Sequence, residues 1–252
     1  MDVAGVGVTA GELCVVVSYY DARPPAELER LLRQIRDSGF DLRDVLVVVN
    51  SVGDATLKLA DGLERVETAY RRNSGFNMGA WDFGWRSRPR YRNYLFLQDE
   101  CAIVRSDWSR EYTRMLDDEH GMAIVGESLQ YWWSWAQLGR MSQPVLSACR
   151  GLASSKEIAL GKSPTHLQTL VVAASNSALT RLGGFVLADE KVEAIASEIL
   201  FSRHAIASGY CIHQSARRPF EFFGHEQWDG IRGNAVGLRW FVTQSLKRVL
   251  LR

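Results

Sequence analysis

Two continuous apolar runs, separated by one amphipathic stretch, constrain the fold of this chain more than any other feature. The runs cover residues 13–20 and 44–50, and both are rich in valine, which is typical of parallel strands that are buried on both faces. Residues 24–40 between them open with proline, place leucine and isoleucine at helical spacing and stop at Gly39. The sequence therefore predicts a βαβ unit.

The same alternation of strand and helix patterns continues downstream. The expected helices cover residues 54–65, 107–121 and 190–209, the last with Val192, Ile195, Ile199 and Ile206 on one stripe, and the expected strands cover 66–72, 93–98, 122–128 and 211–215. A further strand and helix are expected over 166–185, whereas poor periodicity predicts an irregular excursion over 131–163. This order predicts an α/β fold with a Rossmann-type, mostly parallel central sheet flanked by helices, whose ligands bind at the carboxyl ends of the strands.

Charge and cysteine content narrow the class of protein. With 30 basic and 29 acidic residues the net charge is +1, so no overall field attracts nucleic acid. The four cysteines are far apart and form no CxxC motif, which predicts buried thiols in a reducing compartment; they are Cys14, Cys101, Cys149 and Cys211. No signal peptide or bilayer-spanning run is recognised. We therefore expect a cytoplasmic protein, or one that lies peripherally on the inner face of the membrane.

One predicted strand ends in acids with no turn residue in between. The stretch YLFLQDEC runs from a buried strand into Gln98, Asp99 and Glu100. A buried carboxylate costs several kcal/mol unless it is paired, hydrogen-bonded or bound to a metal. These acids are therefore either solvated at the strand end, where they can cap a neighbouring helix, or positioned to bind a cation.

The segment NSGFNMGAWDFG, residues 73–84, is a candidate anion-binding loop. Three glycines and two asparagines between a predicted strand and helix let backbone N–H groups approach an anionic ligand. An ordinary glycine-rich connection has the same composition. The loop precedes the strand that carries Asp99, so the two can share one cleft.

The order of these segments, from VVVSYYD through RRNSGFNMGAWDFG and YLFLQDE to SEILFSRHAIASGY, resembles the GT-A-fold inverting nucleotide-sugar glycosyltransferases of bacterial polysaccharide synthesis. The GFNMGAW segment is similar to loops of rhamnosyltransferase-like and rhamnan-synthesis enzymes. The resemblance covers roughly residues 13–225, so we expect a GT-A-like domain over 1–225 and a tail over 226–252 with an amphipathic basic helix. It implies transfer of a hexose from a nucleotide-diphosphate sugar to a saccharide or lipid-linked acceptor, with inversion, in cell-surface polysaccharide biosynthesis.

The resemblance also implies roles for individual residues. QDE matches the DxD motif, with Gln98 in place of the first acid, so Asp99 and Glu100, joined by His225, would hold Mg²⁺ or Mn²⁺ on the donor diphosphate. Glu198, which lies 11 residues before Gly209, would be the general base. The remaining candidates would bind the nucleotide sugar; they are Ser18, Tyr20, Asn50, Asp54, Asn73, Gly75, Gly79 and Asp82, together with Gln98 and Asp99.

Three alternatives remain open from the sequence. A non-catalytic GT-A-like module that binds nucleotide or glycan and serves as an assembly partner would share these features. The tryptophans of residues 131–137 suit an acceptor-binding wall, core packing or a partner interface. The C-terminal helix, within residues 237–252, suits packing on the domain, a homodimer contact or attachment to an anionic membrane surface.

Overall fold

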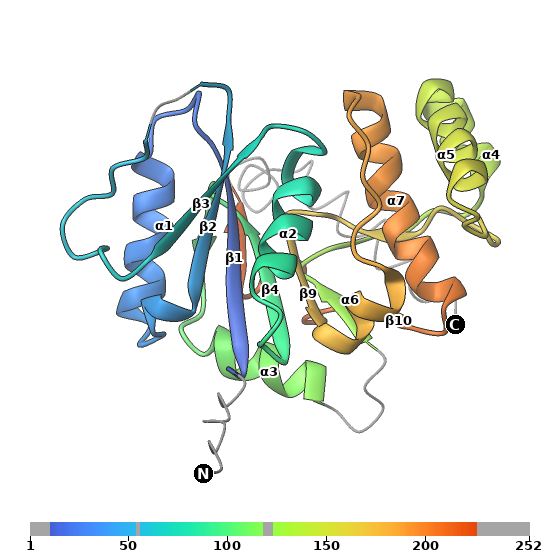
Figure 1. Ribbon diagram of the computed structural model, residues 1–252. Coiled ribbons are helices and arrows are strands. Elements are labelled where there is room, and N and C mark those ends of the chain that lie inside the picture. Colours follow the sequence, from blue (N-terminus) through green and yellow to red (C-terminus); the bar gives the residue numbers. More distant parts are fainter. Residues whose placement is uncertain (1–10, 54–55, 118–122, 226–252) are drawn as a thin grey trace, which may run out of the picture.

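A seven-stranded sheet organises the protein (Figure 1). The computed structural model describes residues 11–53, 56–117 and 123–225. The strands lie in the order β10-β6-β9-β4-β1-β2-β3. Their bounds are Leu13–Tyr20 for β1, Val45–Ser51 for β2, Glu67–Arg72 for β3, Asn93–Gln98 for β4, Ala123–Gly126 for β6, Val171–Ser175 for β9 and Cys211–Gln214 for β10.

Most of this sheet is parallel. Strand β1 pairs in parallel with β2 and β4, β2 with β3, and β6 with β10, whereas β9 runs antiparallel between β4 and β6. The expected α/β class with a mostly parallel, helix-flanked sheet is confirmed. Because β9 is reversed, the residues that precede it lie beside the carboxyl end of β4, where Gln98 N–H donates to the Leu170 carbonyl at 3.4 Å.

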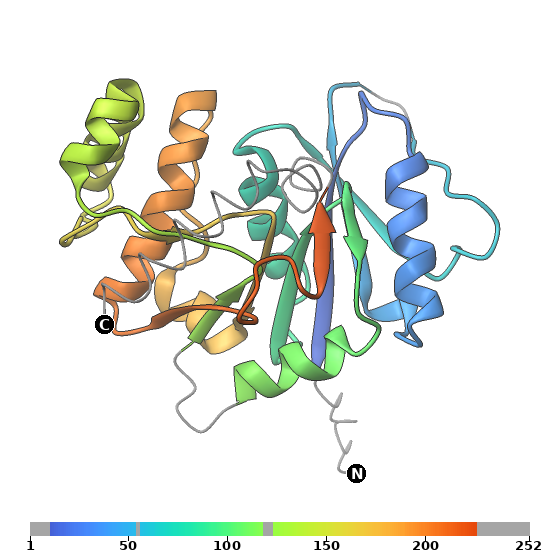
Figure 2. The same ribbon diagram turned by 180° about the vertical axis from the view of Figure 1, so that it is seen from behind.

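Helices cover both faces of the sheet (Figures 1 and 2). Val16 and Val48 face α2, α6 and α7, and Val15 and Val17 face α1 and α3, which is why the first strands read as continuous apolar runs. The helices are α1 Ala26–Asp37, α2 Phe76–Ser87, α3 Trp108–Asp117, α4 Trp135–Met141, α5 Gln143–Ser155, α6 Asn176–Leu182 and α7 Lys191–Ala207, with a 3₁₀ turn at Leu42–Asp44. Two small antiparallel sheets pair β5, Cys101–Ile103, with β11, Phe223–His225, and β7, Leu129–Gln130, with β8, His166–Leu167.

The helix expected over residues 54–65 is wrong, because the described residues 56–66 form an irregular connection between β2 and β3. Asp61 and Gly62 make a turn in the middle of it, with Gly62 at φ +85°. Leu57 and Leu59 pack against the core without helical pairing, and the N–H of Ala60 is satisfied by Glu29 Oε1 at 3.0 Å. The leucines that suggested a helix therefore anchor a loop.

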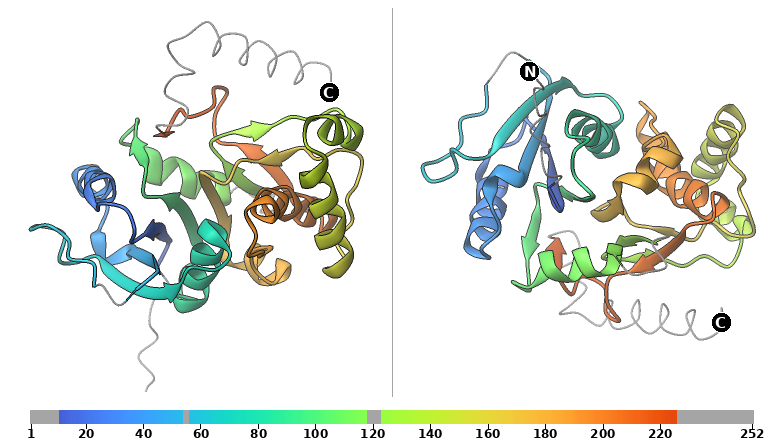
Figure 3. Two further views of the ribbon diagram at one scale, coloured as in Figure 1. Left: turned by 90° about the horizontal axis from the view of Figure 1, so that it is seen from above. Right: turned by 60° about the horizontal axis from the view of Figure 1, so that its bottom comes forward.

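The irregular excursion expected over residues 131–163 is also wrong, because it contains α4 and α5, which lie beside α7 (Figures 1 and 3). Each helix begins with a serine cap: Ser134 accepts from Gln137 N–H and Ser142 from Val145 N–H. The caps identify the helix starts, but α4 has only 7 residues, too few to show a hydrophobic period.

The buried face of α7 differs from the predicted stripe. Ile195 is 49% exposed, whereas Ile199 is buried together with Leu200 and Phe201. The difference arises because α7 is covered by the sheet on one side and by α5 on the other, so its buried residues do not form one apolar stripe.

Two further sequence expectations concern the thiols and the chain ends. All four cysteines are free thiols, but Cys211 on the edge strand β10 is exposed rather than buried. Asp54 and the tail over 226–252, for which the sequence predicts a basic helix, lie outside the described residues. Among the helices of the described residues, none combines the length and apolar character needed to cross a bilayer.

Candidate active site

The carboxyl ends of β1, β2 and β4 bring predicted site residues to one edge of the sheet. Register pairs Tyr20 with Asn50 and Ser18 with Gln98 across neighbouring strands. The backbone N–H of Asp99 then donates to the Ser18 carbonyl at 3.2 Å, which holds the acidic turn against the end of β1. This edge is where parallel α/β sheets bind their ligands.

On the β1 and β2 side the polar side chains hold the start of α2. Buried Ser18 donates its hydroxyl to Asn77 Oδ1 at 3.1 Å, and Asn50 Nδ2 donates to the Phe76 carbonyl at 3.3 Å. Arg71, from the end of β3, donates to Asn50 Oδ1 at 2.7 Å and to Ser74 Oγ at 3.0 Å. Burial lowers the pKa of the Arg71 guanidinium. The sequence reasoning missed Arg71 and Asn77, although both belong to the RRNSGFN segment.

The glycine-rich loop is shorter than predicted. Helix α2 begins at Phe76. Of the loop residues predicted to bind the nucleotide sugar, Asn73 and Gly75 therefore belong to the connection, whereas Gly79 is helical. Gly75 caps the helix at φ +68°, a conformation that favours glycine. Gly79 donates its N–H to the Gly75 carbonyl at 2.7 Å, and a Cβ there would lie 2.2 Å from the Ser74 oxygen. Gly79 therefore permits close packing and offers no free N–H to an anion.

Asp82 lies on α2 and its carboxylate is engaged by the protein. It accepts from Arg86 Nε at 2.7 Å and from Phe185 N–H at 3.0 Å, which fastens α2 to the turn after α6. The protein itself therefore engages this carboxylate, and the contact of Asp82 with a nucleotide stays a prediction.

Asp21 is an acid at this edge that the sequence analysis did not name. It follows β1 directly, accepts from the Ser51 hydroxyl at 2.6 Å and from Val52 N–H at 3.1 Å, and so joins the ends of β1 and β2. The neighbouring Tyr20 is half-buried at this edge. The SYYD stretch carried this signal.

Glu100 sits between two cationic or potentially cationic partners. Its Oε1 is paired with the Arg23 guanidinium, and its Oε2 lies 3.5 Å from Nε2 of His225. His225 is brought there by the pairing of β11 with β5, in which it lies opposite Cys101. The Glu100 side chain is 23% exposed, so it remains open to a ligand.

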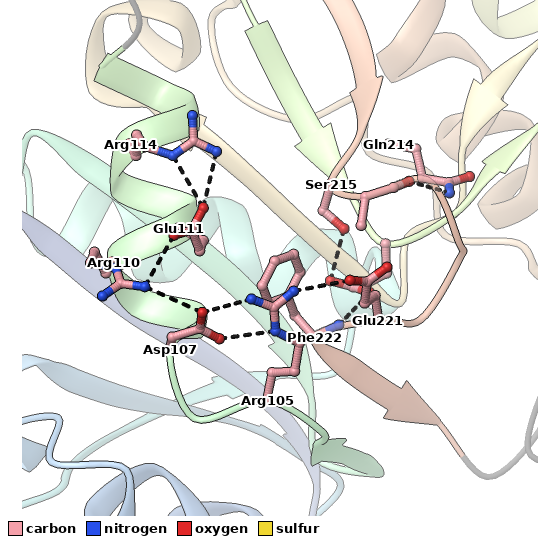
Figure 4. A network of polar contacts seen from close by, with 11 residues as sticks. Arg105, Asp107, Arg110, Glu111, Arg114, Gln214, Ser215, Glu221 and Phe222 are labelled. Carbon is pink, nitrogen blue, oxygen red and sulfur yellow. Dashed lines mark hydrogen bonds and ion pairs between the residues drawn. The ribbon is translucent and has the colours of Figure 1, made fainter.

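A polar network fastens the segment that carries His225 (Figure 4). Arg105 lies between Asp107 and Glu221, at 2.6 Å and 2.9 Å, with its guanidinium 4.5 Å from the centre of the Phe222 ring. Buried Glu127 accepts from Phe222 N–H at 3.2 Å and from the Ser215 hydroxyl at 3.0 Å. These bonds hold β11 against β5 and thereby position His225.

Asp99 is buried without a compensating cation in contact with it. Within the described part of the chain, its carboxylate receives no hydrogen bond from another side chain. Burial, assisted by the negative charge of Glu100 and opposed by Arg23, raises the pKa of Asp99 to about 6. A carboxylate in these surroundings is stabilised in its charged form by a bound cation.

The spacing of Glu100 and His225 at the acidic turn is compatible with a divalent cation. Two ligand atoms at roughly 2 Å from one ion lie on the order of 3 Å apart, which is close to the separation of Glu100 and His225. Carboxylate oxygen suits Mg²⁺ and Mn²⁺, and Mn²⁺ also accepts imidazole. In residues 11–53, 56–117 and 123–225, no three His, Cys, Asp or Glu side chains are arranged as a metal cage. Remaining positions on such an ion would be filled by water and phosphate oxygens.

Glu198 reaches the same edge of the sheet through Thr169. Glu198 Oε2 accepts from the N–H of Thr169 at 3.1 Å and from its hydroxyl, while Oε1 lies 3.1 Å from His166 Nε2. Thr169 in turn accepts from Gln98 Nε2 at 2.7 Å through its carbonyl. Residues 100 positions apart in the sequence, Gln98 and Glu198, are therefore joined through one intervening residue.

Burial raises the pKa of Glu198, but the hydrogen bonds from His166 and Thr169 outweigh this effect and leave the pKa below its ordinary value. The carboxylate is therefore ionised at neutral pH. Its side chain is 22% exposed, so a ligand can approach it.

Gln98 has a physical reason to replace an acid. Its amide donates to the Thr169 carbonyl, and a carboxylate has no donor for that oxygen. The sequence reasoning missed Arg23, His166 and Thr169, which belong to no motif. Only the antiparallel insertion of β9 beside β4 brings His166 and Thr169 to the strand end.

The tryptophan cluster divides between two environments. Trp132 and Trp135 pack against a small core that includes Leu138, Cys149 and Ile199, whereas Trp133 is 48% exposed. Core packing accounts for the buried part of the first two, which are half-buried, and Trp133 is the exposed member of the cluster.

The fold is that of the GT-A glycosyltransferases. GalNAc-T7, solved with UDP, GalNAc and Mn²⁺, is similar to this chain with a TM-score of 0.57 and 12% identity over 86% of this chain and 44% of that one. TarS of S. aureus is similar with a TM-score of 0.51 and 13% identity over 84% of this chain and 36% of that one. This chain thus spans less than half the length of either. No family model matches it, and neither does any curated protein.

Proposed function

We propose that this chain is a glycosyltransferase domain that moves a hexose from a nucleotide-diphosphate sugar to a hydroxyl of a saccharide or lipid-linked acceptor, with inversion. One observation carries the proposal: Asp99, Glu100 and Glu198, distant along the chain, lie at the same carboxyl edge of a GT-A sheet. An acidic turn for a diphosphate-bound cation and a separate ionised carboxylate for a base are what such a transfer requires.

The donor is proposed to lie across the ends of β1, β2 and β4. The bound UDP, GalNAc and Mn²⁺ in GalNAc-T7 support a similar donor class for this fold. Half-buried Tyr20 is proposed to stack on the base, and the start of α2 at Gly75 is proposed to face the phosphate oxygens. Asn73 remains a proposed contact, although its N–H already donates to the Ser51 carbonyl at 3.3 Å. Asp54, outside the described residues, remains a proposed ribose or base contact, and Ser18 and Asn50 hold this surface in shape.

Asp99, Glu100 and His225 are the residues proposed to hold Mg²⁺ or Mn²⁺. Such an ion would supply charge stabilisation to the departing diphosphate. Arg23, already paired with Glu100, adds a second positive charge beside the same turn. Electrostatic stabilisation of this kind is usually the largest single contribution to catalysis.

Glu198 is the proposed general base. Its lowered pKa keeps it ionised at neutral pH, so it can accept the proton of the acceptor hydroxyl as that oxygen attacks the anomeric carbon. We further propose that the chain is related to the rhamnosyltransferase and rhamnan-synthesis enzymes. It would act in cell-surface polysaccharide biosynthesis, on the cytoplasmic side of the membrane. In this setting the tail over 226–252 would contact the membrane surface or a second copy of the chain.

Calorimetric titration with UDP, dTDP and GDP, each with and without Mn²⁺, tests the proposal and identifies the donor class. We expect one nucleotide to bind in the micromolar range and to bind about tenfold more weakly when a chelator is present. A transfer assay against a panel of sugars on that nucleotide then tests turnover. Failure of every nucleotide to bind would refute the proposed function.

A non-catalytic GT-A-like module is the second candidate function. The observation that favours it is the engagement of Glu198 by three donor groups, which weakens a carboxylate as a base. Such a module would bind the nucleotide but release no product with any sugar donor.

A further inference from the structure

The two contacts of the His166 ring require one proton more than a neutral imidazole carries. His166 is buried, with Nδ1 at 2.7 Å from the Pro164 carbonyl oxygen and Nε2 at 3.1 Å from Glu198 Oε1. Both partners are hydrogen-bond acceptors when Glu198 is ionised. A neutral imidazole has only one N–H, so it can satisfy only one of these two contacts.

The carbonyl of Pro164 fixes where the first proton lies, because a carbonyl oxygen can only accept. Nδ1 of His166 must therefore carry a hydrogen, and the second contact closes only if a further proton lies between Nε2 and Glu198. The donors on the other carboxylate oxygen both come from Thr169 and favour the ionised carboxylate. The second proton accordingly belongs to the imidazole.

We propose that Glu198 and His166 form a charged dyad, in which a doubly protonated His166 is the positioning residue for the catalytic carboxylate. The imidazolium and the carboxylate neutralise each other in a site where an isolated charge is costly. Thr169 holds the other carboxylate oxygen, and Gln98 ties Thr169 to the strand that ends in Asp99. The orientation of the base relative to the acidic turn is thereby fixed through the hydrogen bonds of Thr169 and Gln98.

The dyad deepens the proposed function and rests on it for its catalytic meaning. When Glu198 accepts the proton of the acceptor hydroxyl, it becomes neutral and the imidazolium remains, so one positive charge is left beside the departing diphosphate. No bond to His166 forms or breaks in this step. The residue acts through Glu198 and does not itself touch substrate.

The direct test is ¹⁵N NMR of the full chain labelled at its five histidines, at pH 7. His166 is assigned by its loss in His166→Gln. In the native chain we expect both ring nitrogens of His166 to be protonated. In Glu198→Gln the side-chain amide can donate to Nε2, so we expect a neutral ring protonated at Nδ1 only. A neutral His166 in the native chain would overturn the dyad.

Kinetics provide a readout that a merely structural residue would not move. We expect His166→Ala to lower kcat about 10- to 100-fold with the donor KM unchanged, and His166→Gln, whose amide can still donate to Glu198, to recover part of the loss. His204→Gln is the matched control, because His204 lies on α7 with its Nε2 facing the Leu182 carbonyl at 3.2 Å and should leave kcat unchanged. Equal loss of kcat in His166→Ala and His166→Gln would overturn the positioning role.

The two arms separate failure of the dyad from failure of the proposed function. The NMR measurement needs no turnover, so a doubly protonated His166 in a chain that transfers no sugar would support the dyad while refuting the transferase. A neutral His166 in an active chain would refute the dyad alone.

Discussion

The two halves of the candidate site are built from different chemistry. At the ends of β1 and β2, the side chains of Ser18, Asn50 and Asn77 are neutral and are bonded to one another or to the start of α2, flanked by the cation Arg71 and by Asp21, which accepts from Ser51. At the end of β4, ionisable groups meet in pairs: Glu100 with His225, and Glu198 with His166. The first half, called the neutral half below, is held mainly by neutral side chains, whereas the second, called the charged half, can exchange charge with a ligand.

The difference also concerns how far apart the partners lie in the sequence. The neutral half comes from residues 18–77, so the parallel pairing of β1, β2 and β3 and the packing of α2 at the end of β3 assemble it. The charged half joins residues 98–100 to segments near 166, 198 and 225, which requires β9, α7 and β11 all to be in place. The charged half is therefore the part most exposed to errors of folding and to substitution at a distance.

The largest effect is expected from Glu198→Gln, which keeps the shape of the side chain and removes the base. We expect kcat to fall by about 10²- to 10⁴-fold, the typical contribution of a general base, with nucleotide affinity within about threefold of native. Sugar transfer and calorimetry measure the two quantities. The control is Glu193→Gln, a half-exposed acid one turn earlier on α7. If Glu198→Gln transfers sugar at the native rate, Glu198 is not the general base.

The next effect concerns the acidic turn. Asp99→Asn and Glu100→Gln each remove a charged ligand, so we expect Mn²⁺-dependent nucleotide binding to weaken by about 10- to 100-fold, equivalent to about 1.4 to 3 kcal/mol. Titration with and without chelator measures this. Asp37→Asn is the control, because Asp37 is an exposed acid at the end of α1 that pairs locally with Arg36. If both variants bind nucleotide as the native chain does, the turn holds no cation.

In the neutral half, Arg71→Gln should act on shape rather than on charge. The substitution shortens the donor that reaches Asn50 and Ser74, and we expect a loss of about 1 to 2 kcal/mol in the free energy of unfolding, with weaker nucleotide binding to match. Denaturant unfolding and calorimetry measure the two effects. If Arg71→Gln lowers kcat at saturating donor and leaves nucleotide binding unchanged, Arg71 acts in the chemical step, which would contradict this prediction.

The smallest effect is a pH dependence of stability at Glu127, behind the acidic turn. Burial raises the pKa of Glu127, partly offset by hydrogen bonds from Tyr112, Phe222 and Ser215, so the folded chain binds this proton more tightly than the unfolded chain does. The ionised form therefore costs stability at neutral pH, and the cost disappears as the pH falls through the folded pKa toward the unfolded value near 4.5.

This sign is measurable by denaturant unfolding of the native chain and Glu127→Gln at pH 7 and pH 5. The stability of the native chain relative to the variant should rise on going to pH 5, by on the order of 1 kcal/mol. If the free energy of unfolding of the native chain, relative to that of Glu127→Gln, falls on acidification, the ionised form of Glu127 is stabilised by the fold. Glu127 would then belong to the charged half of the site.

Several features of this protein follow from the sequence alone. The valine runs at 13–20 and 44–50 and the helix between them specify a parallel sheet covered on both faces, because only a strand buried on both sides is apolar at every position. The acids after β4 could be placed at the ligand edge for the same reason, since parallel strands end together. Within residues 73–84, glycine content alone did not distinguish a glycine whose N–H is free to bind an anion from one that allows close packing of a helix. Gly79 is of the second kind.

Tertiary structure decided the rest. No local pattern predicts that β9 enters the sheet in reverse beside β4, yet this pairing brings Thr169 to Gln98, and the packing of α7 on β8 then brings Glu198 to His166. Helices α4 and α5 pack against each other, and α5 packs against α7, so the two-sided burial of α7 likewise depends on contacts between segments that are separate in the sequence. Hydrophobic period reports which faces of an element are covered, but it carries no information on which distant element covers them, and that pairing is what assembles the charged half of the site.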